Sequence, residues 1–297
     1  PGTDITVNDV TVGGNLNAKA VNITAQNISA GGNAALNAKT ALTAQNISAG
    51  SDLNAKAVNI TAQNITAGNA TLNAGTDLFA DNVNVGGDAS MTAGAKLTAH
   101  DVSVGGDLNA KANEKIAANN ITSKGKTTLT AQTAIQTDGS IRSDAEAVLT
   151  AKNITIGGAF SAHSAQLTAG ENATLGGKTD VGETLTAHIG KDLVTNGDVT
   201  TGGDFTAQVG KDLAVNGTIA TGKDFVAHVG NDLAVNDLVS TGGNASLTVG
   251  RNVTLDGALT TGGNFTANVG KDLTANAAVL SHGRATIDAQ NVNLNAD

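Results

Sequence analysis

The aspartates best placed to bind a cation or to act as acids and bases recur at one position of a repeated pattern. They are Asp192, Asp212, Asp232 and Asp272, with Asn252 interrupting the series. The position before them holds a cation in most repeats, at Lys191, Lys211, Arg251 and Lys271. A row of carboxylates suits calcium binding or general acid/base catalysis. We favour a turn, G-K-D, in which the neighbouring cations offset repulsion among the acids, because the calcium-binding repeat G-G-x-G-x-D is absent.

Two histidines share the context T-A-H-[IV]-G and could suggest a metal site. His188 and His228 lie two repeats apart, with Gln208 at the same position between them. Stacked repeats would separate the two histidines by roughly 9.6 Å, too far for both to reach one zinc ion at about 2.0 Å. No histidine lies in an H-E-x-x-H pattern. The sequence therefore predicts no metal centre and no cofactor.

The sequence contains no motif that is typical of nucleophilic catalysis. There is no Cys, no G-x-S-x-G and no glycine-rich phosphate loop with G-K-[ST] at its usual spacing. We therefore expect a protein that is not an enzyme.

Composition favours a thin core of small and branched side chains. Of the 297 residues 40% are hydrophobic, but only 2% are aromatic, and Trp, Tyr and Cys are absent. The 37 Gly and single Pro suit tight turns between uninterrupted strands. The net charge of -9, without any long basic block, excludes nucleic acid and anionic membrane surfaces as expected partners. No run of about 18 apolar residues predicts membrane insertion, and the absence of Cys fits an exported bacterial protein.

The sequence repeats throughout. LNAKAVNITAQNI occurs at residues 16–28 and again, letter for letter, at 53–65. The period is 18 or 19 residues over 1–121 and 20 residues over 182–297, and the stretch 122–181 is less regular. We expect one continuous solenoid with a remodelled middle zone, because self-similarity at a fixed period indicates stacked units.

Each repeat reads as short strands. Stretches such as DFTAQV, DLAVNG and TIATGG alternate in polarity and end at Gly, Asn or Asp. A propeller blade needs about 40 residues, whereas one coil of a parallel solenoid needs about 20. The prediction is an all-β, right-handed parallel β-helix with three short strands per coil. About 15 coils at the strand spacing give roughly 70 Å.

Stacking explains why the same residue types recur one period apart. Phe205 and Phe225 should stack on adjacent coils, with Phe265 two coils further on and Ala245 leaving a gap between them. We interpret this column as core rather than as an aromatic binding platform.

Many asparagines lie in N-x-[ST] sequons and could carry glycans. They include Asn22, Asn27, Asn64, Asn120, Asn216 and Asn264. The structural interpretation is favoured: Asn can form amide ladders along a stack and tolerates the left-handed turn conformation.

Parallel β-helices also include polysaccharide lyases and hydrolases, so one stretch of the chain could still carry an enzymatic site. Those enzymes gather charged residues in a groove, and only the irregular stretch 111–178 offers such a set. Its charged residues include Glu114, Lys115, Lys124, Lys126, Arg142, Asp144 and Glu146. A polysaccharide-active enzyme is the second alternative function.

Units such as GGDFTAQVGKDLAVNGTIAT and SAGGNAALNAKTALTAQNIS resemble the haemagglutinin repeats of two-partner-secreted exoproteins, the filamentous haemagglutinin family. Relatives of that family include large adhesins and contact-dependent growth inhibition proteins. The resemblance implies a right-handed parallel β-helix, export through an outer-membrane β-barrel transporter, and exposure at the bacterial surface or outside the cell. It implies a surface receptor on a host or another bacterium as partner. The chain lacks the N-P-N-G and V-E-N-N motifs of that family, so secretion and toxin delivery are expectations for a parent protein.

These observations favour a non-catalytic stalk or adhesin segment that holds a binding or effector tip away from a surface. The first alternative is an extracellular filament subunit that self-associates end to end, because an open strand edge can template another chain.

Overall fold

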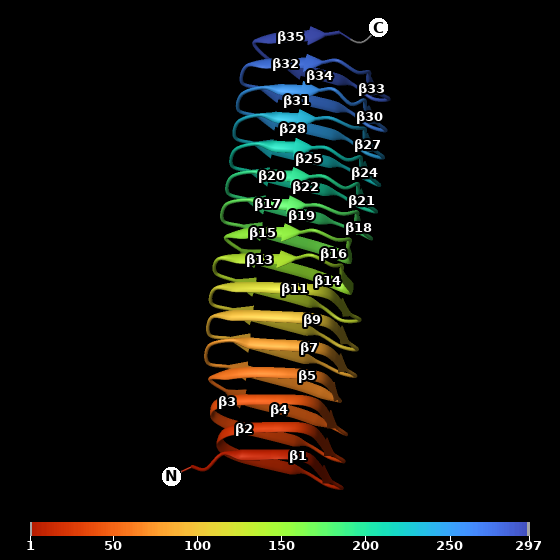
Figure 1. The fold of residues 1–297 in the computed structure, drawn as a ribbon. Helices are drawn as coiled ribbons and strands as arrows, with labels where there is room; N and C mark the ends of the chain where they lie inside the picture. The colour runs from red at the N-terminus through yellow and green to blue at the C-terminus, as the bar shows by residue number, and fades with distance from the viewer. Residues whose placement is uncertain (1, 296–297) are drawn as a thin grey trace. The chain divides into compact units, whose positions relative to one another are not determined.

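The structure, a computed structural model, describes residues 2–295 and contains strands and no helix. The strand pairs with a described register are parallel, and the chain forms a β-solenoid of about 15 turns, which confirms the predicted fold class. The chain divides into unit 1, residues 1–145, and unit 2, residues 146–297. In each unit, strands of successive turns lie over one another (Figure 1).

Unit 1 is built mainly from long strands. They are β1 (Ile5–Val12), β2 (Leu16–Ala30), β3 (Ala34–Ala49), β4 (Asp52–Ala57), β5 (Asn59–Ala67), β6 (Asn69–Ala74), β7 (Leu78–Val85), β8 (Ala89–Ala93), β9 (Lys96–Val104), β10 (Leu108–Ala112), β11 (Lys115–Ser123), β12 (Thr127–Ala131) and β13 (Ala134–Thr137). The division between the units falls within β14 (Ile141–Ala151).

The turns of unit 1 differ from the expected three strands. From β4 to β11 each turn has two strands, because the longer one passes through a corner and stays paired on both sides of the corner residue. A single residue with positive φ makes that corner: Asn64 (51°), Asn82 (52°), Asp101 (48°) and Asn120 (53°). Asn and Asp tolerate this left-handed conformation better than other residues with a side chain.

Unit 2 is built from shorter strands. They are β15 (Asn153–Ile156), β16 (Phe160–Ala169), β17 (Ala173–Leu175), β18 (Thr179–Val181), β19 (Leu185–Ile189), β20 (Leu193–Thr195), β21 (Val199–Thr201), β22 (Phe205–Val209), β23 (Leu213–Val215), β24 (Ile219–Thr221), β25 (Phe225–Val229), β26 (Leu233–Val235), β27 (Val239–Thr241), β28 (Ala245–Val249), β29 (Val253–Leu255), β30 (Leu259–Thr261), β31 (Phe265–Val269), β32 (Asp272–Ala275), β33 (Val279–Ser281), β34 (Ala285–Asp288) and β35 (Asn291–Leu294).

The turns of unit 2 settle into three strands and a shift of 20 residues. Ile154 pairs with Ala173, a shift of 19, whereas Phe205 pairs with Phe225. The three strands β22, β23 and β24 are separated by three-residue turns. Alternate side chains of each strand point inward, as the period-two pattern requires.

The core is narrow and mostly aliphatic, with four buried phenylalanines in unit 2. Phe160, Phe205, Phe225 and Phe265 are each at most 1% exposed. The rings of Phe205 and Phe225 have centroids 5.4 Å apart, and Ala245 pairs with both Phe225 and Phe265. The structure thus places this column inside the stack. Burying one such ring stabilises the fold by about 1.5–3 kcal/mol.

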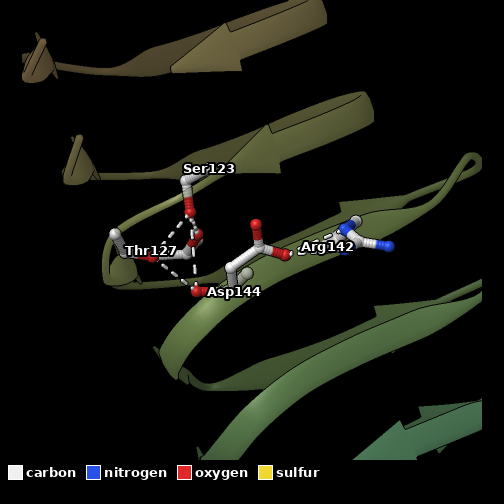
Figure 2. A network of polar contacts seen from close by, with 6 residues as sticks. Ser123, Thr127, Arg142 and Asp144 are labelled. Atoms are coloured by element: carbon white, nitrogen blue, oxygen red, sulfur yellow. Dashed lines mark hydrogen bonds and ion pairs between the residues drawn. The ribbon is translucent and has the colours of Figure 1, made fainter. Parts of the chain in front are cut away.

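Buried hydroxyl groups at the ends of some strands donate hydrogen bonds to the connection that follows. In unit 2 Thr201, Thr221, Thr241 and Thr261 each donate a hydrogen bond to the carbonyl two residues ahead, at 2.9–3.1 Å. In unit 1 Ser123 makes the same bond to Gly125 at 3.0 Å and lies 2.5 Å from the Thr127 hydroxyl (Figure 2). Ser143 donates to the same Gly125 carbonyl. These bonds satisfy groups that would otherwise be costly to bury.

Candidate functional site

The aspartate column of unit 2 is engaged in joining one turn to the next. The backbone N–H of Asp212 donates to Asp192 Oδ1 at 3.3 Å, and that of Asp232 donates to Asp212 Oδ1 at 3.1 Å. Asn252 N–H continues the series to Asp232 Oδ1 at 3.0 Å. Asp272, the first residue of β32, instead accepts from Asn291 Nδ2 at 2.6 Å. One oxygen of each carboxylate therefore accepts a hydrogen bond from the next turn.

The cations beside this column form short surface networks. Glu171 lies between Lys191 Nζ, at 2.7 Å, and Lys152 Nζ, at 3.6 Å. The hydrogen bond from Lys191 lowers the pKa of Glu171, burial opposes that shift, and the charge of Lys152 adds to it. Arg251 Nε lies 3.9 Å from Asp232 Oδ1. Among the described residues, no group of three or more His, Asp or Glu is placed to hold a metal ion.

His188, Gln208, His228 and Thr248 stand in register on the outer face of unit 2 and line one side of a shallow groove. The groove has a volume of ≈ 690 Å³, and its other lining residues are a column of Val and Ile and a column of glycines. A Cβ on Gly210 would lie 2.2 Å from the Gly190 carbonyl oxygen one turn below, so the stack itself requires glycine there. The groove is a consequence of stacking, and it offers imidazole and amide groups along a nearly apolar floor.

Charged residues of the irregular zone pair locally. Arg142 and Asp144 lie on the same strand, with Arg142 Nη2 2.9 Å from Asp144 Oδ1 (Figure 2). Lys115 Nζ donates to Gln136 Oε1 at 2.7 Å, and Glu114 and Lys124 are exposed.

The remaining charged residues of this zone, Lys126 and Glu146, each line a shallow depression of the surface. In unit 1 Lys126 lines one of ≈ 470 Å³ with Asp88 and Asp107. In unit 2 Glu146 lines one of ≈ 210 Å³ with Ser164 and Gln166. Asp88 Oδ1 and Asp107 Oδ1 each accept a backbone N–H of the next turn, at 2.8 and 2.7 Å, and both depressions are shallow, unlike the cleft that glycoside hydrolysis uses.

The sequon asparagines take part in turn-to-turn hydrogen bonds. In unit 1 the chain of side-chain bonds runs through Asp9, Asn27, Asn46, Asn64 and Asn82, at 2.5–2.8 Å. Asn120 donates to Asp101 at 2.9 Å, and Asn22 donates to Asp4 at 2.9 Å. In unit 2 Asn216 donates to Asn196 at 2.8 Å, and Asn264 Oδ1 accepts the Arg284 N–H at 2.8 Å. Each of the six candidates thus has a structural role, and glycosylation stays a prediction.

Phe79 is the residue that the sequence patterns did not single out. It points outward from β7, half-buried, between Thr61 one turn before and Thr98 one turn after. Its ring meets the His100 ring edge-on at 5.6 Å between centroids, and His100 Nδ1 lies 4.0 Å from Asp81 Oδ1.

A shallow depression adjoins Phe79. Its volume is ≈ 420 Å³, and its polar lining includes Asn59, Asp77 and Lys96. The available signal was the triplet Leu-Phe-Ala at 78–80, where other repeats read Leu-Thr-Ala. An aromatic ring replaces a hydroxyl there on an outward position.

The fold defines this chain as a parallel β-solenoid. Comparisons with family models, with curated proteins and with solved structures find no match. No helix among the described residues has the length and apolar character needed to cross a membrane.

Proposed function

We propose that the chain is a non-catalytic structural segment of an exported bacterial protein, a stalk that extends a binding or effector tip from the cell surface. The observation that carries the proposal is the steady turn length within each unit. Paired residues of successive turns are 17–20 positions apart, as in Asp52 with Asn69 and Ile121 with Ile141. Turns this uniform have no room for the long loops that shape the grooves of β-helix enzymes.

The polar side chains support the same conclusion. Asp and Asn columns that would be obvious catalytic or metal-binding candidates accept backbone and amide N–H groups of the next turn instead. A stack held in this way gains stability from each neighbouring pair of turns, so it can extend while its core stays narrow. Such an architecture is suited to spanning distance rather than to enclosing a substrate.

Secretion, location and partners rest on the resemblance to haemagglutinin-repeat exoproteins. On that basis the parent protein would cross the outer membrane through a β-barrel transporter and would work outside the cell or on its surface. Its tip would bind a receptor on a host or on another bacterium.

The adhesive part of this proposal has one concrete candidate in unit 1. Phe79 presents an aromatic ring beside Asn59, Asp77 and Lys96, which together offer hydrogen-bond donors and acceptors. A ligand with an apolar face and a hydroxyl rim, such as a pyranose ring, would fit this combination. Phe79→Thr is the natural control, because Thr occupies this outward position at both Thr61 and Thr98.

Electron microscopy of the purified chain across a concentration series tests the stalk proposal. Discrete particles near 70 Å, the length of about 15 turns, would support a stalk segment. Long fibres with continuous turn spacing would replace it with the filament subunit. Cleavage of a polysaccharide from a defined panel, lost in an Arg142→Ala/Asp144→Ala variant, would replace it with the enzyme.

A further inference from the structure

Two Asn-Gly dipeptides occupy the same corner on adjacent turns of unit 2. They are Asn196-Gly197 and Asn216-Gly217, each directly after a three-residue strand. Asn followed by Gly is chemically labile, because a glycine nitrogen without a neighbouring side chain can reach the Asn side-chain carbon. Both corners are thus candidates for spontaneous modification.

The backbone contacts of the two corners are alike. Asn196 N–H and Gly197 N–H both donate to Leu175 O, at 2.8 and 3.4 Å. Asn216 N–H and Gly217 N–H both donate to Thr195 O, at 2.8 and 3.3 Å. Backbone hydrogen bonding therefore gives no reason for different reactivity.

The side chains differ by one hydrogen bond. Asn216 Nδ2 donates to Asn196 Oδ1 at 2.8 Å, and Asn216 Oδ1 accepts from Asn236 Nδ2 at 2.7 Å. Asn196 takes part only in the first of these bonds, as the acceptor. Its own side-chain amide has no acceptor one turn earlier, because the equivalent position there is Gly176, which has no side chain. Among the described residues nothing accepts the Asn196 amide hydrogens. Asn196 and Asn216 are both exposed, but Gly197 is more accessible than the buried Gly217.

We propose that Asn196 is a site of spontaneous deamidation and that the amide ladder Asn196–Asn216–Asn236 protects Asn216. The Gly197 nitrogen loses its proton and bonds to Asn196 Cγ, the Cγ–Nδ2 bond breaks, and ammonia leaves with that proton. Water then opens the five-membered imide at either carbonyl and yields aspartate or isoaspartate. No oxidant or cofactor enters the balance.

Ring closure must rotate the side chain away from its ladder partners. Asn196 breaks one hydrogen bond to do so, whereas Asn216 breaks two. An extra hydrogen bond of about 1 kcal/mol slows the step about fivefold. The lower accessibility of Gly217 acts in the same direction.

Asp256 shows what an acidic residue does in this column. It accepts from Asn276 Nδ2 at 2.7 Å but, having no amide hydrogen, cannot donate to the turn below. Aspartate at position 196 would therefore keep the acceptor that holds Asn216. Isoaspartate adds a methylene to the backbone and would displace that acceptor, which would expose Asn216 next.

The test is peptide mapping by mass spectrometry, with fragmentation that separates aspartate from isoaspartate. The full chain is incubated in mildly alkaline buffer for weeks, folded or in denaturant. We expect both Asn-Gly sites to react at similar rates when unfolded and Asn196 to react at least about fivefold faster than Asn216 when folded. Asn27 and Asn64, each followed by Ile, serve as slow internal controls.

Two variants isolate the ladder from accessibility. Asn196→Asp keeps the acceptor for Asn216 Nδ2, so the Asn216 rate should stay at the wild-type value. Asn196→Ala removes that acceptor and should raise the Asn216 rate about fivefold. Circular dichroism verifies that both variants are folded. Equal folded rates at the two sites, protection of both sites, or identical Asn216 rates in the two variants would each overturn the proposal.

Discussion

Unit 1 and unit 2 make the same corner in two ways. In unit 1 a single Asn or Asp with positive φ, such as Asn120, leads directly into the strand segment Ile121–Ser123. In unit 2 a three-residue turn, Asn216-Gly217-Thr218, leads into β24, and Asn216 is not among the residues with positive φ. Both corners keep an amide ladder. The ladder can therefore be retained while the turn changes length, provided that Asn keeps its position facing the next turn.

The two units also differ in what fills the stack. Unit 2 contains all four buried phenylalanines and a column of buried Thr hydroxyl groups, whereas the core of unit 1 is mainly Ala, Leu, Ile and Val with one Met, and its buried Ser and Thr residues lie near its C-terminal end, at Ser123, Thr127, Thr137 and Ser143. The only Phe in unit 1 points outward. Shorter strands joined by three-residue connections therefore accompany bulkier core side chains in unit 2, and each of these differences can be tested by a matched substitution.

The largest effect should come from a charge in the phenylalanine column. Phe225→Asp removes a ring that is 0% exposed and leaves an unpaired carboxylate in its place. We expect a loss of more than about 4 kcal/mol, since truncating a core Phe alone costs about 3–5 kcal/mol. Phe79→Asp in unit 1 is the control and should cost far less. Urea unfolding with hydrogen exchange compares them, and equal losses would contradict the inward and outward assignments.

A smaller loss should follow from adding a methyl group to the glycine column of unit 2. Gly210→Ala would place a Cβ 2.2 Å from the Gly190 carbonyl oxygen, so two turns must separate. Such overpacking costs about 1–3 kcal/mol. Gly86→Ala in unit 1 meets no atom closer than 3.9 Å and should be neutral. Thermal unfolding of the two variants decides the matter, and a neutral Gly210→Ala would show that the turns are less tightly stacked.

Replacing the corner Asn by Ala should destabilise unit 1 more than unit 2. Asn64→Ala must hold a left-handed backbone without Asn, at about 1–2 kcal/mol beyond the lost hydrogen bonds. Asn64→Gly loses only those bonds, because glycine accepts positive φ. In unit 2 Asn216→Ala should resemble Asn64→Gly. Denaturant unfolding that ranked Asn216→Ala with Asn64→Ala would remove the distinction between the corners.

Two buried threonines of unit 2 should respond in opposite directions to loss of the hydroxyl. Thr195 Oγ1 is buried without a partner, and Val215 and Val235 occupy the same column, so Thr195→Val should stabilise by about 1 kcal/mol. Thr201 Oγ1 donates to Gly203 O at 3.0 Å, so Thr201→Val should destabilise by a similar amount. Shifts of the same sign in the unfolding midpoint would refute the hydrogen-bond assignment.

The smallest effect should be the acid sensitivity of the Lys152–Glu171–Lys191 network. The folded-state pKa of Glu171 is lowered, chiefly by the Lys191 hydrogen bond. Its contribution is therefore present above the usual Glu range and is lost as pH falls through the lowered folded-state pKa. Glu171→Gln should remove this pH-dependent contribution to stability, and the variant should still fold at neutral pH. Stability curves against pH, measured at low salt, would run parallel for the two proteins if the network contributed nothing.

Much of the architecture could be predicted from periodicity. The 18–20-residue repeat and its alternating segments predicted a parallel solenoid, which the structure confirms. Corner geometry was harder to predict, because N-I-T and N-G-T look alike as polar turn signals. Only the backbone shows that Asn64 bends the chain alone, whereas Asn216 needs two following residues.

The sequence by itself determined that identical positions stack, because a side chain repeated every turn has its own equivalent as its nearest neighbour. That is why the Phe, Asp and Asn columns could be named from spacing. The tertiary structure decided which way each side chain points and what it contacts. Phe79 faces outward and Thr195 lies buried without a partner because a strand has two faces, and the pairing register fixes which face each residue occupies.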